Sequence, residues 1–431
     1  MPVIGDRAEA LWKFYVSAPT PMARFDAENL VQSFSLTKLG SQIRAKTILL
    51  PVNLQGVPGG EIHLGSALYG EKQVGEVRVS PDELMRHVGL FATTGSGKTN
   101  LCYYLLIQLV RLKIPFLVVD WKRSYRVLRS LPEARGIKVF TVGRDVRPIF
   151  WNPLRPPPRI SVHTWITILS EVLEKSHVSG QGVADILMEH ISRAFEVRER
   201  ESDYPNFHDV RESVGRVTYK GRRQLWQDSC LRILRSLTFG PATAALNHRE
   251  PAHLENLLNE QVIFELDQEL PKNLRVFLVE VLFRWIHLFR LGQGETGKLR
   301  HVLVLEEVHN LFPRSSFEFQ SASGLENVFR ELRSFGQGLV SVTQHPSVLP
   351  IYILGNTNTL IFMGLTHESD IFAARQALFL QREEGAYLDQ LKVGEGIVKI
   401  KGRVPACHVR FPLVPLKLGS VSDARLRADA D

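Results

Sequence analysis

The segment Ala92-Thr93-Thr94-Gly95-Ser96-Gly97-Lys98-Thr99 constrains the fold of this chain more than any other. It follows the apolar run 87–91 and precedes a helical pattern over 101–111, which gives the order strand, glycine-rich loop, helix. Glycines remove the obstruction of a Cβ, so that several backbone N–H groups can converge on phosphates at a helix N-terminus. The pattern therefore predicts a loop that holds a nucleoside triphosphate.

Each polar residue of this loop has an expected role. Lys98 would reach the β- and γ-phosphates, and the Thr99 hydroxyl would help to hold Mg²⁺ beside them. The expected nucleotide contacts come from Thr94, Gly95, Ser96, Gly97, Lys98, Thr99 and Asn100. Ala92 replaces the first glycine of the usual motif. The alternative is a flexible glycine turn without a ligand.

Composition describes a globular chain able to bury a large core, with 431 residues of which 44% are hydrophobic. The net charge of +8 favours an acidic polymer as partner, although such a surplus can also serve solubility alone. Cys102, Cys230 and Cys407 are isolated, which indicates neither a zinc site nor a disulfide framework and suits the reducing cytoplasm. The longest apolar stretches carry charges, so we expect no membrane span.

Strand and helix patterns alternate from residue 87, which predicts an α/β fold. Strands are expected at 88–91, 116–120, 139–142, 262–266, 301–305, 338–343, 359–363 and 396–400. We predict a small β-rich N-terminal cap over 1–85, with a helix at 9–16 and strands at 47–52 and 74–79. The first part of the α/β core would span 86–155, a helical insertion 156–258, the second part of the core 259–418 and a disordered tail 419–431.

The apolar strand that ends at Leu305 is followed by Glu306 and Glu307. This is the pattern expected of the strand beside the phosphate loop in a nucleotide hydrolase. Glu306 would hold the Mg²⁺ shell, and Glu307 would orient and deprotonate the attacking water. The alternative is a solvated acidic pair after a core strand.

Three further polar residues are candidates for catalysis. Gln344 follows the next strand and is placed to sense the γ-phosphate or position the water; a surface glutamine is the alternative. An arginine at 330 or 333 would reach across a subunit boundary and stabilise charge on the phosphoryl group. Ordinary salt bridging within a helix is the alternative for both Arg330 and Arg333.

Taken in order, these motifs resemble the HerA/FtsK group of ring-forming P-loop ATPases, and more narrowly its HerA-like branch. The resemblance covers about residues 60–415 and rests on the stretches His87–Thr99, Leu305–Asn310, Arg330–Gly336 and Thr343–Pro346. The stretches 118–125 and 151–154 also look like segments of the ATPases of conjugation and type IV secretion, which belong to the same broad group.

The resemblance implies a RecA-like P-loop core with a mainly parallel sheet flanked by helices. It further implies a homo-oligomeric, hexameric ring that binds ATP and Mg²⁺, hydrolyses ATP at subunit interfaces and moves along duplex DNA. Glu306 and Glu307 would take the metal and catalytic roles, Gln344 the sensor role, and Arg333 or Arg330 the finger from a neighbour. A nuclease or other effector protein in DNA processing, repair or defence is the expected partner.

DNA contacts have two candidate segments. The stretch 211–235 carries seven basic residues with interleaved aromatic side chains, namely Arg211, Arg216, Lys220, Arg222, Arg223, Arg232 and Arg235 with Tyr219 and Trp226. A solvated basic face is the alternative. The second candidate is 312–324, with Arg314.

Two other functions stay open: a secretion-type ATPase that moves DNA or protein, and a nucleotide-switched scaffold that activates a partner enzyme.

Overall fold

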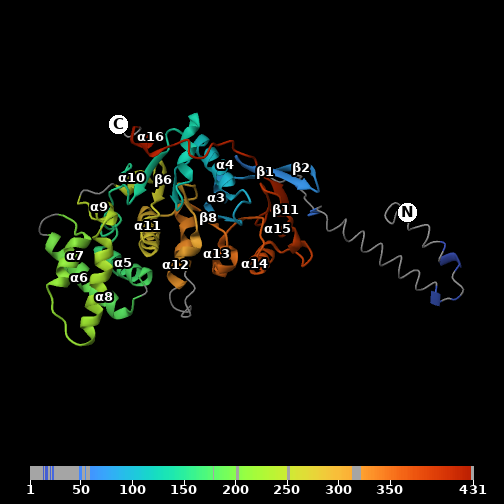
Figure 1. Cartoon of the computed structure of the whole chain (residues 1–431). Helices are drawn as coiled ribbons and strands as arrows, with labels where there is room; N and C mark the ends of the chain where they lie inside the picture. The colour runs from blue at the N-terminus through green and yellow to red at the C-terminus, as the bar shows by residue number, and fades with distance from the viewer. Residues whose placement is uncertain are drawn as a thin grey trace.

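One sheet of eleven strands runs through the protein, in the order β2-β1-β11-β10-β9-β3-β8-β7-β4-β6-β5 (Figure 1). The computed structural model describes residues 13, 15–17, 20, 22–23, 48–50, 54, 59–177, 179–199, 203–249, 253–312 and 322–428. The strands are β1 Ile62–Tyr69, β2 Lys72–Val79, β3 Val88–Phe91, β4 Phe116–Asp120, β5 Lys138–Val142, β6 Gln261–Leu266, β7 His301–Leu305, β8 Gln337–Thr343, β9 Thr359–Met363, β10 Glu395–Ile400 and β11 Val404–Arg410.

The strands from β9 through β3, β8, β7, β4 and β6 to β5 are paired in parallel. The strands β10, β11, β1 and β2 continue the sheet in antiparallel fashion. Parallel strands need helical crossovers, which is why the central strands are buried on both faces and consist almost entirely of apolar residues. This arrangement confirms the predicted α/β fold with a mainly parallel sheet.

Helices cover both faces of the sheet, so the core has two layers. Successive strand residues point to opposite faces: Leu90 belongs to the apolar cluster that contains α4 (Lys98–Arg111), and Phe91 to the cluster that contains α11 (Lys272–Gln293). The other helices around the sheet are α3 Pro81–Met85, α12 Ala322–Glu331, α13 Ile351–Asn356, α14 Glu368–Leu378 and α15 Tyr387–Gln390.

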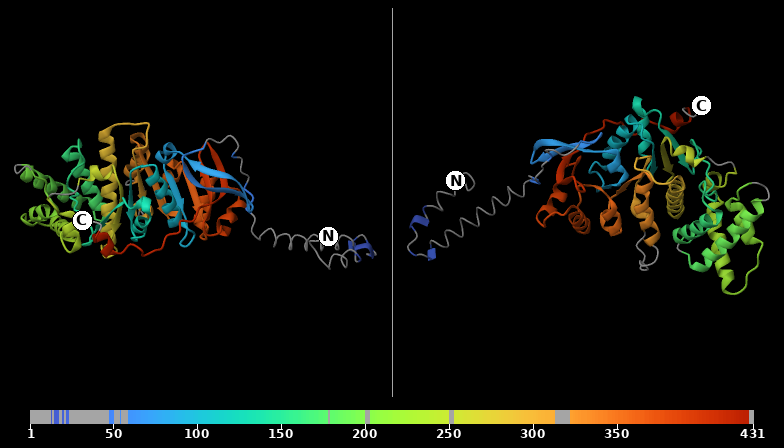
Figure 2. Two further views of the ribbon diagram at one scale, coloured as in Figure 1. Left: turned by 90° about the horizontal axis from the view of Figure 1, so that it is seen from above. Right: turned by 180° about the vertical axis from the view of Figure 1, so that it is seen from behind.

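A helical lobe lies at the β5–β6 end of the molecule, away from β1 and β2 (Figures 1 and 2). It contains α5 Val162–Ser176, α6 Gln181–Glu199, α7 Phe207–Gly215, α8 Arg222–Leu237, α9 Pro241–Leu246 and α10 Leu254–Leu257, all between β5 and β6 in sequence. Its buried residues share one apolar cluster with α11, which attaches the lobe to the core. No helix in the described part of the chain is both long and apolar enough to cross a membrane.

The strands β1 and β2 fall within the segment 1–85. They extend the central sheet, because β1 pairs with β11, with Ser66 opposite Arg410. The boundary at residue 85 stays a prediction. The helix expected at 9–16 and the strand expected at 47–52 lie partly outside the described residues, and residues 48–50 are not in a strand.

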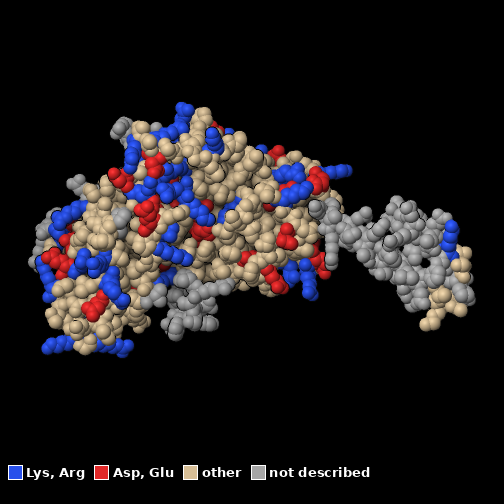
Figure 3. Space-filling model, viewed as in Figure 1, with Lys and Arg blue, Asp and Glu red and all other residues tan. Residues whose placement is uncertain are grey.

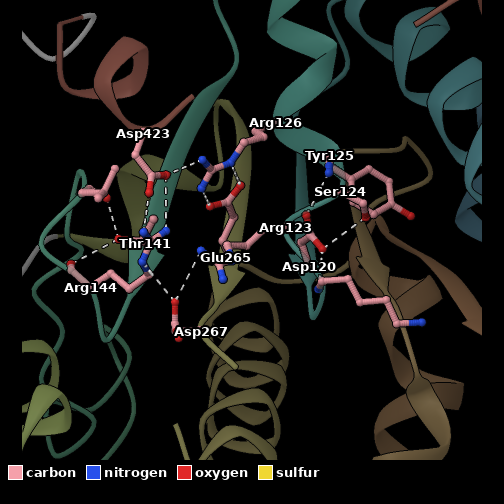
Figure 4. Close-up of polar contacts among 12 residues, drawn as sticks. Asp120, Arg123, Ser124, Tyr125, Arg126, Thr141, Arg144, Glu265, Asp267 and Asp423 are labelled. Atoms are coloured by element: carbon pink, nitrogen blue, oxygen red, sulfur yellow. Dashed lines mark hydrogen bonds and ion pairs between the residues drawn. The ribbon is translucent and has the colours of Figure 1, made fainter. Parts of the chain in front are cut away.

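The C-terminal segment differs from the disorder predicted for 419–431. Residues Asp423–Ala428 form helix α16, and Leu426 is fully buried against the core. Figure 4 shows Asp423 between the side chains of Arg126 and Arg144, and it forms ion pairs with both. Arg126 also binds Glu265 at the end of β6. One buried leucine and these ion pairs, all formed with residues far away in the sequence, order the segment on the core.

Candidate functional site

The phosphate loop joins the carboxyl end of β3 to the first turn of α4. Gly97 caps α4 with φ 101°, and Gly95 has φ 85°, both in the left-handed region that glycine adopts without strain. A Cβ at Gly97 would lie 3.2 Å from the Gly394 nitrogen and 3.3 Å from Met363 Cε. The backbone conformation therefore favours glycine at 97, and a Cβ there would also be tightly packed. At Gly95 nothing lies within 4 Å of the position of a Cβ.

Hydrogen bonds hold the loop against the strands behind it. The Thr93 N–H and hydroxyl both donate to the Gly364 carbonyl, at 3.1 and 2.6 Å. The Ser96 hydroxyl donates to the Thr93 carbonyl at 2.7 Å, and the Gly394 N–H donates to the Ser96 carbonyl at 2.9 Å. These contacts fix the curvature of the loop without a ligand, and such preorganisation lowers the cost of binding.

Lys98 begins α4 and is 9% exposed. Burial lowers its pKa, and the carboxylates of Glu307 and Glu306 oppose that shift. The two acids that sequence placed on a neighbouring strand thus lie close enough to act on the loop lysine. They do not follow the strand beside β3, however: β8 lies between β3 and β7 in the sheet. The expected strand order was therefore wrong, but Glu306 and Glu307 still lie close to Lys98.

Glu306 is 6% exposed at the end of β7. The Tyr125 hydroxyl, from the 3-10 turn η1 (Tyr125–Ser130), donates to its Oε1 at 2.9 Å. Burial, together with the nearby charge of Asp120, raises the pKa of Glu306 to about 7. Its Oε2 is buried and has no hydrogen-bond partner among the described residues. Glu306 is thus held by one oxygen and presents the other.

Glu307 has a left-handed backbone, φ 46° and ψ 41°, which turns the chain directly after β7. Its Oε1 accepts from Lys122 Nζ at 2.8 Å and from Gln344 Nε2 at 3.0 Å. Burial would raise its pKa, but the hydrogen bond from Lys122 and the charge of Lys98 outweigh burial and lower it. Glu307 is therefore ionised at neutral pH, as a base that accepts a proton must be.

Gln344 links the base to the phosphate loop. Its Nε2 contacts Glu307, and its Oε1 accepts a hydrogen bond from the Thr94 hydroxyl at 2.8 Å. It follows β8, whose last residue Thr343 is paired with Phe91 at the end of β3. The side chain thus lies between the loop and the base, where the sequence placed it.

The Glu306 carboxylate fits a magnesium ion, because its Oε2 is buried without a hydrogen-bond partner in the described part of the chain. The Oε2 atom of Glu307 also lacks a hydrogen-bond partner there and lies 3.5 Å from His309 Nδ1. Mg²⁺ prefers oxygen ligands and is usually held by one or two carboxylates together with substrate phosphates. Thr99, in the first turn of α4, adds a hydroxyl at the expected place in the motif.

Arg330 and Arg333 lie at the opposite end of the sheet from the phosphate loop. They belong to α12 and the following turn η4 (Leu332–Phe335), which precede β8, whereas the loop follows β3, and β3 and β8 are parallel. With Arg86 and Lys401 they line a cavity of about 260 Å³. Neither arginine belongs to the site formed by the phosphate loop of its own chain.

Asn100 does not direct its side chain to the phosphates. Its Nδ2 donates to the Pro412 carbonyl at 2.8 Å, and its Oδ1 accepts from the Val414 N–H at 2.8 Å. The side chain of Asn100 thus holds the segment after β11 against α4. Conversely, the sequence did not predict that Lys122 contacts Glu307 or that Tyr125 contacts Glu306, although the stretch 118–125 contains both residues.

The two predicted DNA segments differ in what the structure shows. In the stretch 211–235, Arg216 pairs with Glu212, and Arg223 pairs with Glu189 at 3.2 Å. Basic side chains are spread over the helical lobe and the adjoining core, with acidic ones among them (Figure 3). Most of the other predicted segment, 313–321, lies outside the described residues.

The fold and the site together define a P-loop ATPase. The family model described as the central domain of the helicase HerA matches residues 62–337, and the chain belongs to this family. A probable helicase of Methanocaldococcus jannaschii is 22% identical over 337 residues, which are 75% of this chain and 62% of that protein. The chain thus spans less than two thirds of this relative.

Two solved structures share the fold. VirB4 of Thermoanaerobacter pseudethanolicus is 16% identical, with a TM-score of 0.64 over 83% of this chain and 98% of that one. The plasmid coupling protein TrwB, in complex with a non-hydrolysable GTP analogue, is 14% identical, with a TM-score of 0.60 over 87% of this chain and 99% of that one. At these identities the likenesses show that the fold is shared.

Proposed function

We propose that this protein is a ring-forming ATPase that couples ATP hydrolysis to translocation on duplex DNA. One observation carries the proposal: the residues to which we assign roles in hydrolysis lie at opposite ends of the sheet. Lys98, Glu306 and Glu307 meet at the carboxyl end of the parallel strands, whereas Arg330 and Arg333 lie at the amino end. An arginine so placed serves hydrolysis only at the site of another copy, and a ring supplies that copy to every site.

Hydrolysis in this site would use the chain's own groups as follows. The loop N–H groups and Lys98 bind the β- and γ-phosphates. Glu307 accepts the proton of the attacking water on its Oε2, because Lys122 and Gln344 occupy its Oε1. Glu306 and Thr99 would hold Mg²⁺, which would neutralise charge on the phosphates.

Several observations support DNA as the polymer. The net charge is +8, the family is that of a helicase domain, and the archaeal relative bears the name of a probable helicase. We place the duplex contacts on exposed basic side chains of the helical lobe that form no ion pair within the described residues, such as Lys220 and Arg232. A hexamer acting in the cytoplasm with a nuclease or effector partner completes the proposal.

DNA-stimulated ATP turnover tests the function. We expect duplex DNA to raise turnover severalfold, and Lys98→Ala and Glu307→Gln to abolish it. Glu368→Gln, the same change at an exposed carboxylate of α14, is the matched control and should keep wild-type turnover. Turnover indifferent to DNA would favour the nucleotide-switched scaffold, and turnover that survives Lys98→Ala would remove the assignment of the phosphate loop.

The arginines have a separate test. Subunits carrying Arg333→Ala and subunits carrying Glu307→Gln are each expected to be inactive alone. Mixed rings should recover part of the activity, because some interfaces then combine an intact arginine with an intact base. The same mixture with Arg330→Ala shows which arginine acts. Absence of recovery with either arginine would contradict action between subunits.

A further inference from the structure

A second cavity, distinct from the phosphate loop, opens at the amino end of β6 and β7. Its volume is about 610 Å³, and its lining includes three arginines, Arg159, Arg290 and Arg300. Arg290 lies in the last turn of α11, and Arg300 directly precedes β7. The phosphate loop follows the opposite, carboxyl end of the parallel strands. The two sites are therefore separate.

Arg290 is a buried cation without a counter-charge. Arg290 is 2% exposed. Its Nε donates to Gln337 Oε1 at 3.2 Å, and its Nη1 donates to Gln293 Oε1 at 2.8 Å. Its Nη2 is buried without a hydrogen-bond partner, and no carboxylate in the described part of the chain forms an ion pair with it. Buried charges are unfavourable unless they are paired, so this arginine requires an explanation.

The surroundings do not supply the missing charge. Burial lowers the pKa of Arg290 to about 10, so that the guanidinium remains charged at neutral pH. His301 is fully buried beside Gln337, and its pKa is lowered by burial and by the charge of Arg290, which leaves it neutral. The carbonyl end of α11 contributes only about half a negative charge.

The other two arginines are held in place by neutral groups. Arg159 Nη1 donates to the Gly292 carbonyl at 3.1 Å, and Arg300 Nη1 donates to the Gly294 carbonyl at 3.1 Å. Neither forms an ion pair with another described residue. Three arginines thus line one cavity at the end of α11, and Arg290 keeps one buried N–H donor without a partner.

We propose that this cavity binds a small molecule through its phosphate group. Guanidinium groups match phosphate oxygens in a two-pronged geometry, and a cavity of this size accommodates a mononucleotide-sized ligand. Phe289, which also lines the cavity, adds an apolar wall and is braced by stacking on Trp285 at 5.3 Å. This binding site is independent of ATP hydrolysis at the phosphate loop.

The test uses the full chain with Lys98→Ala, which weakens phosphate binding at the loop, and inorganic pyrophosphate as the probe. Thermal unfolding is measured against pyrophosphate concentration, with sodium chloride added to equal ionic strength. We expect a saturable rise in melting temperature, and a loss of affinity of tenfold or more on adding Arg290→Met or Arg300→Met. Arg382→Met, at an exposed arginine between α14 and α15, is the matched control and should leave the rise unchanged.

The outcomes separate the possibilities. Without pyrophosphate, Arg290→Met should melt no lower than its parent, because it removes an unpaired buried charge. A large fall would mean that Arg290 is a structural residue, and would overturn the proposal. A rise that persists in both Arg290→Met and Arg300→Met, or the absence of any saturable rise in the parent, would also overturn it. Arg300 is more exposed, so its variant remains informative if Arg290→Met does not fold.

Discussion

The hydrogen bond from Tyr125 to Glu306 provides a sharp test of the metal site. Tyr125 is fully buried, and its hydroxyl is the partner of Glu306 Oε1 at 2.9 Å. Tyr125→Phe removes that hydroxyl and leaves both oxygens of a buried carboxylate without a hydrogen-bond partner among the described residues. The variant should therefore hold Glu306 less firmly in the orientation that binds Mg²⁺.

The magnitude follows from the strength of such bonds. Mg²⁺ binds the ionised form of Glu306, and a hydrogen bond to a charged group contributes about 1.5–3 kcal/mol. At about 1.4 kcal/mol for each factor of ten, its loss weakens Mg²⁺ binding by about 10- to 100-fold. The same range is typical when a group that supports a metal ligand is removed. We expect Tyr125→Phe to raise the Mg²⁺ concentration for half-maximal turnover by this factor.

Tyr103→Phe is the matched control for this prediction. Tyr103 is 5% exposed and packs edge to face with Tyr125 at 5.5 Å, but its hydroxyl donates to the Ser124 carbonyl at 2.8 Å. Both variants lose a buried phenol hydroxyl, whereas only Tyr125→Phe loses a contact to Glu306. Titration of Mg²⁺ into the nucleotide complex, followed by calorimetry, measures affinity without turnover. Equal Mg²⁺ affinities in the two folded variants would refute the reasoning.

Three other predictions concern the C-terminal helix, α4 and the phosphate loop. Hydrogen bonds from Arg144 and Arg126 hold the pKa of Asp423 below its ordinary value of 3.8. The stability that the ionised Asp423 contributes is therefore present above pH 3.8 and is lost as the pH falls. Asp423→Asn should lower the free energy of unfolding by about 1 kcal/mol near neutral pH; in urea titrations, a difference that does not shrink below about pH 4 would be inconsistent with this linkage. Asn100→Ala should cost about 1–2 kcal/mol of stability but leave nucleotide affinity unchanged by calorimetry; a large loss of affinity would restore a nucleotide role for the side chain. Gly97→Ala should weaken nucleotide binding more than Gly95→Ala, because only the former adds a steric contact to the left-handed strain; equal losses would argue against that contact.

The sequence predicted the centre of the site because its chemistry is local. Two apolar runs each predict a strand. The first is followed by two glycines and Lys98, and the second by Glu306 and Glu307. Parallel strands bring such ends to one edge of a sheet, so the juxtaposition follows from the fold class. Gln344 could be placed by the same reasoning.

Other features depend on contacts between distant segments, which no local pattern encodes. Tyr125 reaches Glu306 across 181 residues, and Lys122 reaches Glu307 across 185. The insertion of β8 between β3 and β7 is likewise a matter of topology. The helix α16 forms because partners far along the chain bury Leu426 and pair with charges beside it.

Displacement of a third strand from duplex DNA tests the proposed motor most directly. A protein that moves along the duplex removes a triplex-forming oligonucleotide ahead of it, at a rate set by ATP hydrolysis. We predict displacement by the wild-type chain with ATP and Mg²⁺, and none with a non-hydrolysable analogue or with Glu307→Gln. Duplex-stimulated hydrolysis without displacement would contradict translocation, and displacement by Glu307→Gln would contradict the role given to the base.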